Sequence, residues 1–273
     1  MTRFVVVPQW QGSSSPRAMA LIDGAEAIAG DLPRSSSTRI DVPLEAGDAR
    51  GGDVARLSAL LQVRRAVDAE LAVGTEPVLL VGGDCSVSVA GIAHAAARHG
   101  RIAVVWADAH PDLHSPASST SHAFSGMSLR AVLGEGPDGL RLPSGAVAAS
   151  DVVLVGTRSI DEPEAEFLAA SGVRRVDVDA LADPEAIAAA VAATGAEAVY
   201  VHVDVDVLDP AHMPGVKTAA PFGAQLPELV AALKRLREAV PVVGASLTEF
   251  VPASAADASA DMGTLLRLVG SLA

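Results

Sequence analysis

The sequence predicts an α/β fold built on a mainly parallel sheet that helices cover on both faces. Short β-branched runs alternate with longer stretches rich in Ala and Leu along all 273 residues. The runs are strongly apolar, which is typical of strands buried on both faces of a parallel sheet. The alternation continues without a linker or an internal repeat. We therefore expect one domain that covers residues 1–273.

The expected strands are short runs dominated by valine, isoleucine and leucine. Branched side chains of this kind favour the extended backbone and pack well on a pleated surface. In chain order the expected strands are Phe4–Val7, Arg39–Val42, Pro77–Val81, Ile102–Trp106, Val152–Val155, Arg175–Val178, Ala198–Val203 and Val242–Leu247.

The expected helices lie between these strands and are marked by composition and by start signals. Pro16 and Pro227 suit the first turn of a helix, where a missing backbone N–H removes no hydrogen bond. Asp183, directly before Pro184, suits an N-cap. In chain order the expected helices are Pro16–Leu32, Ala55–Val73, Val87–His99, Glu162–Ala170, Pro184–Ala193, Pro227–Ala239 and Ser259–Leu272.

Composition limits the class of protein and its partners. Half of the residues are hydrophobic, which is enough for a sizeable core, and the net charge of −13 argues against nucleic acid or an anionic membrane as partner. An acidic surface is compatible with a cationic substrate. The single cysteine, Cys85, excludes an intramolecular disulfide and fits a reducing compartment. The apolar run Phe4–Val7 is too short for a signal peptide, so we expect a cytoplasmic protein.

Two groups of metal-ligand side chains follow expected strands. Asp108, His110 and Asp112 are spaced at i, i+2 and i+4, and Asp204 and Asp206 repeat the two-residue spacing. Residues two apart on an extended segment project from the same face, so each group can point at one spot. Isolated pairs of this kind are usually solvated turns, but unpaired charge at a buried strand end is costly. Bridging carboxylates suit two neighbouring divalent cations, and we predict a binuclear metal site.

Two further residues lie at the ends of expected strands. Cys85 is in the turn Gly82–Ser86, where it is either a small buried hydrophobic residue or, as a thiolate, a metal ligand. Glu249 is a surface charge, a helix-entry residue or an acid that receives a guanidinium or ammonium group. Ligands of open α/β sheets bind at the carboxyl ends of strands, where we expect both residues to join the aspartates.

Four motifs, taken together, resemble the arginase/agmatinase (ureohydrolase) family over residues 79–252. They are Gly-Gly-Asp-x-Ser from Gly82, Asp-Ala-His-x-Asp from Asp108, His-x-Asp-x-Asp-x-Leu-Asp-Pro from His202 and Glu-x-x-Pro from Glu249. The resemblance implies a three-layer α/β/α sandwich and two Mn²⁺ ions. It also implies a metal-bridging hydroxide that attacks the guanidinium carbon of an arginine-like amino acid and releases urea or a urea derivative. Family members usually assemble as trimers or hexamers, so a homo-oligomer is expected.

The resemblance also implies roles for single residues. Asp108 and Asp204 would bridge the two metals. The remaining ligands would be His110 and Asp206 at one metal, and Asp112 and Cys85 at the other. The implied substrate-binding residues are Ser121, Asp161, Thr218 and Glu249. The implied catalytic residues are Asp206, Glu249 and His122, with Asp206 or His122 supplying the proton of the leaving amine.

Three positions depart from the family pattern. Cys85 stands where most members have His, Ser125 where arginases have the His that moves the proton, and His114 where arginases have a carboxylate-binding Asn. The cysteine resembles a branch that acts on hydroxyguanidines such as Nω-hydroxy-L-arginine, whose less basic leaving group needs less acid catalysis. It also makes divalent ions other than Mn²⁺ possible. The alternatives are an agmatinase- or formiminoglutamase-like hydrolase and a catalytically silent metal-binding relative.

Overall fold

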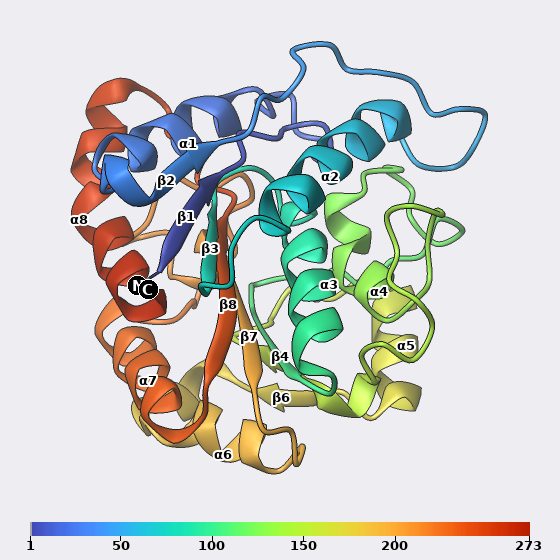
Figure 1. Cartoon of the computed structure of the whole chain (residues 1–273). Coiled ribbons are helices and arrows are strands. Elements are labelled where there is room, and N and C mark those ends of the chain that lie inside the picture. The colour runs from blue at the N-terminus through green and yellow to red at the C-terminus, as the bar shows by residue number, and fades with distance from the viewer. Residues whose placement is uncertain (1) are drawn as a thin grey trace.

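The computed structural model describes residues 2–273, and its strands form one eight-stranded sheet in which every neighbouring pair is parallel (Figure 1). The strand order is β2-β1-β3-β8-β7-β4-β5-β6. The predicted α/β fold class is confirmed. The strands are β1 Arg3–Val6, β2 Ser37–Arg39, β3 Val78–Val81, β4 Ala103–Ala107, β5 Val152–Val155, β6 Arg174–Val176, β7 Val199–Asp204 and β8 Val242–Thr248.

Helices cover both faces of this sheet. Helices α1, α6, α7 and α8 pack together on one face, and α2, α3, α4 and α5 lie on the other (Figure 1). The helices are α1 Ala20–Gly30, α2 Leu57–Leu71, α3 Val87–His99, α4 Ser128–Val132, α5 Glu162–Ser171, α6 Ala186–Ala192, α7 Leu226–Ala239 and α8 Ala255–Leu272.

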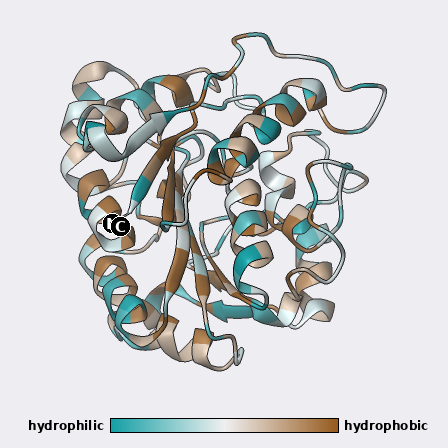
Figure 2. Ribbon diagram, in the orientation of Figure 1, coloured by the Kyte–Doolittle hydropathy of each residue, from teal (hydrophilic) through white to brown (hydrophobic). Residues whose placement is uncertain are grey.

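The apolar core follows the sheet. Strands β3, β4 and β5 are buried along their whole length, and the hydrophobic colouring of Figure 2 is concentrated on the central strands. Burial on both faces explains why these strands are continuous apolar runs rather than alternating ones. Within residues 2–273, no helix is long and apolar enough to span a membrane.

Three local predictions were wrong. Strand β2 ends at Arg39, whereas we expected it to begin there, because it pairs with β1 only through residues 37–39. Helix α1 begins at Ala20, so Pro16 does not lie in its first turn. Arg17 lies before α1 and donates to the carbonyl of Pro252 at 2.8 Å. This tertiary contact holds residues 16–19 in turns.

The start of α6 was also misplaced. Its N-cap is Glu185, and Asp183 accepts a hydrogen bond from the Glu185 backbone N–H at 3.0 Å. Asp183 closes the preceding 3₁₀ helix Val178–Ala182, and this delays the α-helix by two residues. Pro227, in contrast, lies in the first turn of α7 as predicted.

The strand order brings the chemically important segments together. Strands β3, β8, β7 and β4 are consecutive neighbours in the centre of the sheet. Because they are parallel, their carboxyl ends meet at the same edge. These ends lead into Cys85, Glu249, the Asp204/Asp206 pair and Asp108, respectively.

Candidate metal centre

The turn between β3 and α3 brings Cys85 to the carboxylates. Gly82 has a φ of +83°, and a Cβ there would lie 2.3 Å from the Cβ of Ala25, so only glycine fits. The Cys85 Sγ lies 3.2 Å from Asp204 Oδ2 and 3.7 Å from Glu249 Oε1. Burial, followed by the charges of the surrounding carboxylates, raises the pKa of the Cys85 thiol well above its ordinary value.

His110 joins Asp108 and Asp206. Its Nδ1 lies 3.0 Å from Asp206 Oδ2 and 3.5 Å from Asp108 Oδ1, and Asp206 Oδ1 accepts from the backbone N–H of Ala109. Burial alone would lower the pKa of His110, but hydrogen bonds to the two carboxylates raise it to about 12. The two motifs that the sequence separates therefore form one cluster.

Asp204 belongs to the cluster through Cys85, whereas Asp112 is in none of the groups of neighbouring ligand atoms. Asp204 Oδ1 accepts from the Asp206 backbone N–H at 2.7 Å, which turns its other oxygen towards Cys85. Asp112 has a φ of +52°, and its carbonyl accepts from the first residues of α4. Burial, followed by neighbouring carboxylates, raises the pKa of Asp112 and of Asp204 well above the ordinary carboxyl range. Such a concentration of acids calls for compensating positive charge.

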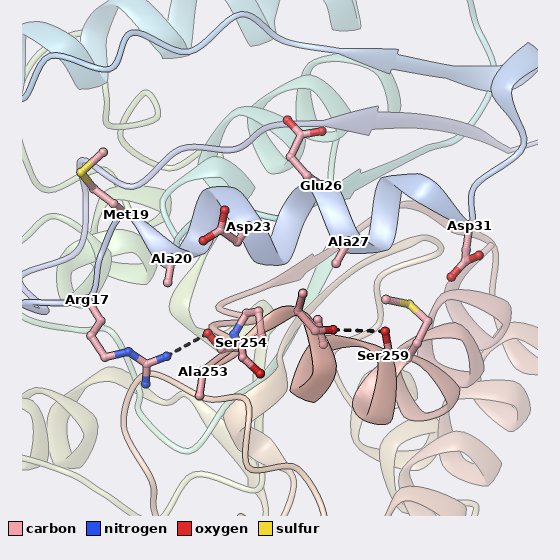
Figure 3. A pocket seen from close by; sticks show the side chains of 14 residues that line it. Arg17, Met19, Ala20, Asp23, Glu26, Ala27, Asp31, Ala253, Ser254 and Ser259 are labelled. Carbon is pink, nitrogen blue, oxygen red and sulfur yellow. Dashed lines mark hydrogen bonds between the residues drawn. The ribbon is translucent and has the colours of Figure 1, made fainter.

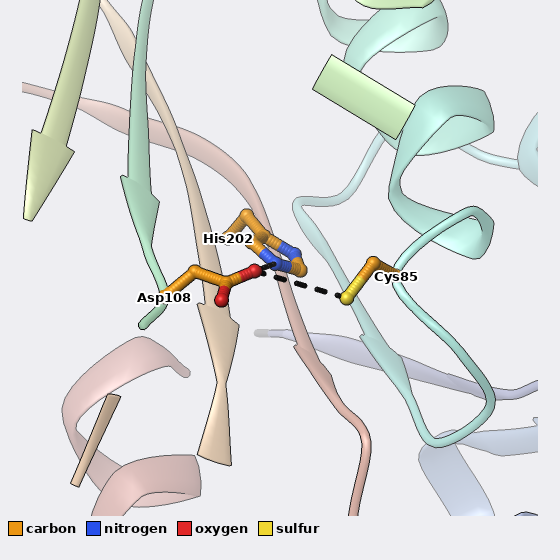
Figure 4. Close-up of side chains that lie close together, drawn as sticks. All are labelled: Cys85, Asp108 and His202. Carbon is orange, nitrogen blue, oxygen red and sulfur yellow. Dashed lines mark hydrogen bonds and ion pairs between the residues drawn. The ribbon is translucent and has the colours of Figure 1, made fainter. Parts of the chain in front are cut away.

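His202 is a member of the cluster that the sequence analysis did not select. It lies on β7, stacks on Trp106 at 3.6 Å between ring centroids, and pairs its Nδ1 with Ser88 Oγ at 2.8 Å. Its Nε2 faces Asp108 Oδ2 at 3.8 Å and has no hydrogen-bond partner (Figure 4). The signal was present, because His202 precedes Asp204 by the same two-residue spacing that joins Asp204 to Asp206.

The donor set fits divalent metal ions. Two buried atoms at this place that the substrate would not use, Asp112 Oδ2 and His202 Nε2, have no hydrogen-bond partner. Unsatisfied buried acceptors of this kind are what a bound cation would satisfy. Three overlapping groups have ligand atoms close enough to hold an ion: Cys85/Asp108/His202, Cys85/Asp204/Glu249 and Asp108/His110/Asp206. Asp108 belongs to two of them, which suits a carboxylate placed between two ions.

Lys217 is a second residue that the sequence analysis did not select. Its Nζ lies 3.1 Å from Glu249 Oε1, and the Glu249 side chain is buried. Burial alone would lower the pKa of Lys217, but Glu249 and neighbouring acidic groups raise it well above its ordinary value. Lys217 lies in a loop with no helical or strand period, so no sequence pattern pointed to it.

A sequence model of the arginase family matches residues 23–271. The chain belongs to the arginase family. Members of the family are hydrolases that act on guanidino and amidino compounds, and the resemblance inferred from the four motifs is confirmed.

Individual relatives are similar to the chain over different lengths. Arginase from Staphylococcus aureus (strain MRSA252) is 32% identical over 181 residues, which are 64% of this chain and 60% of that enzyme. Arginase from Bacillus caldovelox is 30% identical over 256 residues, covering 88% of this chain and 84% of the relative. The crystal structure of Entamoeba histolytica arginase in complex with L-ornithine superposes with a TM-score of 0.86 at 20% identity, covering 99% of this chain and 97% of that one. At this low identity, the superposition with the Entamoeba histolytica enzyme shows only that the two chains share a fold.

The substrate-binding and proton-donating residues implied by the arginase-family motifs have different settings. Thr218 and His110 line a cavity of about 640 Å³, and Asp161 Oδ2 lies 3.0 Å from His114 Nε2. Ser121 pairs with a neighbouring serine in its own loop. His122 is exposed, and its Nδ1 lies 2.9 Å from the carbonyl of Asp53. These contacts do not test the proposed roles, which stay predictions.

A larger cavity lies elsewhere on this arginase-family fold. It measures about 830 Å³ and is lined by residues of α1, α8 and the segments that flank α1 and precede α8 (Figure 3). Its charged lining residues are Arg17, Asp23, Glu26 and Asp31, and neither His nor Cys lines it. The candidate site is therefore the donor cluster at the carboxyl edge of the sheet and not the cavity of larger volume.

Proposed function

We propose that this chain is a binuclear-metal-dependent amidinohydrolase that cleaves the guanidino or hydroxyguanidino group of an arginine-like amino acid into urea or a urea derivative. One observation carries the proposal. Carboxylate, imidazole and thiol donors from the ends of four neighbouring strands converge at one buried place, with His110 also lining a cavity. Family membership supports the reaction class, and the donor set supports the dependence on metal.

The proposed ligands divide between two divalent cations. Asp108 and Asp204 would lie between the ions, with the other ligands being His110 and Asp206 at one ion, and Asp112 and Cys85 at the other. We propose Mn²⁺ for the oxygen and nitrogen donors, whereas the Cys85 thiolate favours more thiophilic ions such as Zn²⁺. When bound, a pair of such cations generates hydroxide near neutral pH and offsets developing negative charge.

The chain's own residues would bind and orient the substrate. The free oxygen of Glu249 can accept an N–H of the reacting group. Asp161, in the family's α-amino position, and Thr218 would hold the amino-acid end, and Ser121 its carboxylate. Asp206 would hold the proton that the leaving amine takes up, with His122 as the second proton donor, and the contact of Asp206 Oδ2 with His110 Nδ1 at 3.0 Å supports this role.

A substrate panel tests this function. Manganese-loaded protein would be incubated with L-arginine, Nω-hydroxy-L-arginine, agmatine and N-formimino-L-glutamate, and urea, hydroxyurea and formamide would be measured. We expect product from an amino-acid guanidine or hydroxyguanidine. Product from agmatine or formiminoglutamate alone would assign the agmatinase- or formiminoglutamase-like alternative. Two bound metals with no product would assign the silent relative. Asp206→Asn, purified in parallel, controls for contaminating enzymes.

A further inference from the structure

The two oxygens of the Glu249 carboxylate differ in their partners. Oε1 accepts from Lys217 Nζ at 3.1 Å and from the backbone N–H of Cys85 at 3.3 Å. Oε2 is buried and has no partner. The carboxylate therefore has one oxygen free, and its charge is already paired with an ammonium group.

Lys217 is held in this place by the backbone. Val216, the residue before it, forms an antiparallel bridge with Phe250, the residue after Glu249. The neighbouring pair is closed by a hydrogen bond of 2.8 Å from the Val251 N–H to the Gly215 carbonyl. The two segments run side by side, so the Lys217–Glu249 contact belongs to a paired structure rather than to a free surface side chain.

This pairing affects recognition of the substrate. A guanidinium ion binds a carboxylate best through two parallel N–H···O bonds, which need both oxygens and an unpaired negative charge. Glu249 offers one oxygen and, together with Lys217, no net charge. A cationic guanidinium would also meet the ammonium group of Lys217, whereas an uncharged group would need only the single N–H···Oε2 bond.

We propose that Lys217 is a specificity-determining residue that fills one oxygen of Glu249 and cancels its charge, so that the site selects an uncharged guanidine-type reacting group over a guanidinium cation. N-Hydroxyguanidines, whose electron-withdrawing substituent lowers their basicity, belong to this chemical class. The inference rests on the proposed amidinohydrolase function and names the form of the group that the site accepts.

Binding of two small probes tests the inference without turnover. Guanidinium chloride and N-hydroxyguanidine would be titrated into manganese-loaded protein at mildly alkaline pH, where the first is a cation and the second is largely uncharged. We expect the wild-type protein to bind N-hydroxyguanidine more tightly. Lys217→Met should shift the ratio of the two dissociation constants about tenfold towards guanidinium, the size of one charge-assisted hydrogen bond.

The chain supplies a matched control, because Lys234 is its only other lysine and is exposed on α7. Lys234→Met should leave the ratio unchanged. Lys217→Gln replaces Lys217→Met if the latter does not fold. Tighter wild-type binding of guanidinium, binding of neither probe, or equal ratios in the Lys217 and Lys234 variants would overturn the inference. A shifted ratio with no turnover of any amidine would instead refute the proposed function alone.

The same variants separate specificity from structure in the reaction. For turnover of L-arginine and Nω-hydroxy-L-arginine, Lys217→Met should change the ratio of the two kcat/KM values mainly through KM. A loss of kcat by the same factor on both substrates would show that Lys217 only supports the fold of the site, and would count against the inference.

Discussion

Cys85 places a thiol among donors that are otherwise oxygen and nitrogen. Burial and then the nearby acids raise its pKa, so the metal-free protein carries the protonated thiol. The thiolate is the form that binds metal, so a cation must displace this proton. Because the raised pKa keeps the Cys85 thiol protonated at neutral pH, metal binding at neutral pH releases this proton. The affinity of a Cys85-ligated metal should rise with pH.

Substitution of Cys85 tests its role as a ligand. Cys85→Ala should release about one proton fewer per protein when metal binds, and should weaken Zn²⁺ more than Mn²⁺. Calorimetric titrations in two buffers of different ionisation enthalpy count the protons. An unchanged count and unchanged affinities would mean that the thiol only packs against the site.

The aspartates should differ in how much metal binding depends on them. Asp108 belongs to two of the ligand groups, whereas Asp204 and Asp206 belong to one each. A carboxylate between two cations contributes to both sites, so Asp108→Asn should weaken both metals and Asp206→Asn mainly one. The family motifs imply that Asp204 also bridges the metals, so Asp204→Asn should behave like Asp108→Asn. Metal titration of these three isosteric variants checks the order, and equal loss of both metals from all three would contradict it.

Helices and strands were predicted correctly from the sequence where short-range patterns of residues determine them. The central strands β3, β4 and β5 could be predicted because a buried parallel strand must be continuously apolar. Strand β2 was displaced because pairing with β1, not composition, sets the extent of an edge strand. Helix α4 was not predicted, since its five residues, Ser128–Val132, are too few for a helical period. It starts where Leu129 and Arg130 donate to the carbonyl of Asp112, a contact that no sequence pattern reveals.

Packing of one helix supports the loop that carries Glu249. A Cβ on Gly24 in α1 would lie 2.0 Å from the carbonyl oxygen of Phe250, next to Glu249. Gly24→Ala should therefore move this backbone, lower the free energy of unfolding by roughly 1–3 kcal/mol and weaken metal binding. In the same helix a Cβ on Gly30 meets nothing within 4 Å. Gly30→Ala should leave stability unchanged or raise it by up to ~1 kcal/mol.

Urea unfolding and metal titration of both glycine variants measure these effects. A Gly24→Ala protein as stable as Gly30→Ala, with wild-type metal affinity, would show that the loop after β8 yields without consequence for the site.

For the molecule as a whole, the sequence predicted where in the fold the site lies more completely than it predicted which residues form it. Parallel strands meet at one edge, so ligand-type residues that follow them must converge. Five of the six predicted ligands lie together there, namely Cys85, Asp108, His110, Asp204 and Asp206. Lys217 could not be foreseen, because it reaches Glu249 through pairing between loops that are more than thirty residues apart. Long-range pairing of irregular segments leaves no period in the sequence.

The same convergence concentrates acids inside an already acidic molecule, whose net charge is −13. Burial, then neighbouring charges, raises the pKa of Asp112, Asp204 and Asp206 in the absence of metal. A carboxyl group with a raised pKa binds more protons in the folded state than in the unfolded state. The contribution of these aspartates to the free energy of unfolding therefore falls as pH rises above the ordinary carboxyl range. Asp108, whose pKa is lowered by His110 and His202 against burial, acts in the opposite direction, but only at lower pH.

Metal binding should reverse this loss. We expect the Tm of EDTA-treated protein to fall between about pH 5 and pH 8, because the clustered acids lose protons that the fold retains at low pH. Manganese-loaded protein should not show this fall, since cations neutralise the acids and stabilise by roughly 2.7 kcal/mol at a hundredfold excess over Kd. Thermal unfolding of both forms across this range measures the difference in Tm between them, which should widen as pH rises.

Two variants test whether the clustered acids cause the decline. In the metal-free state Asp204→Asn should flatten the fall of Tm with pH, and Asp41→Asn, at an exposed position, should not. Parallel pH profiles for the loaded and stripped wild-type protein would show that the acidic cluster is not the metal centre.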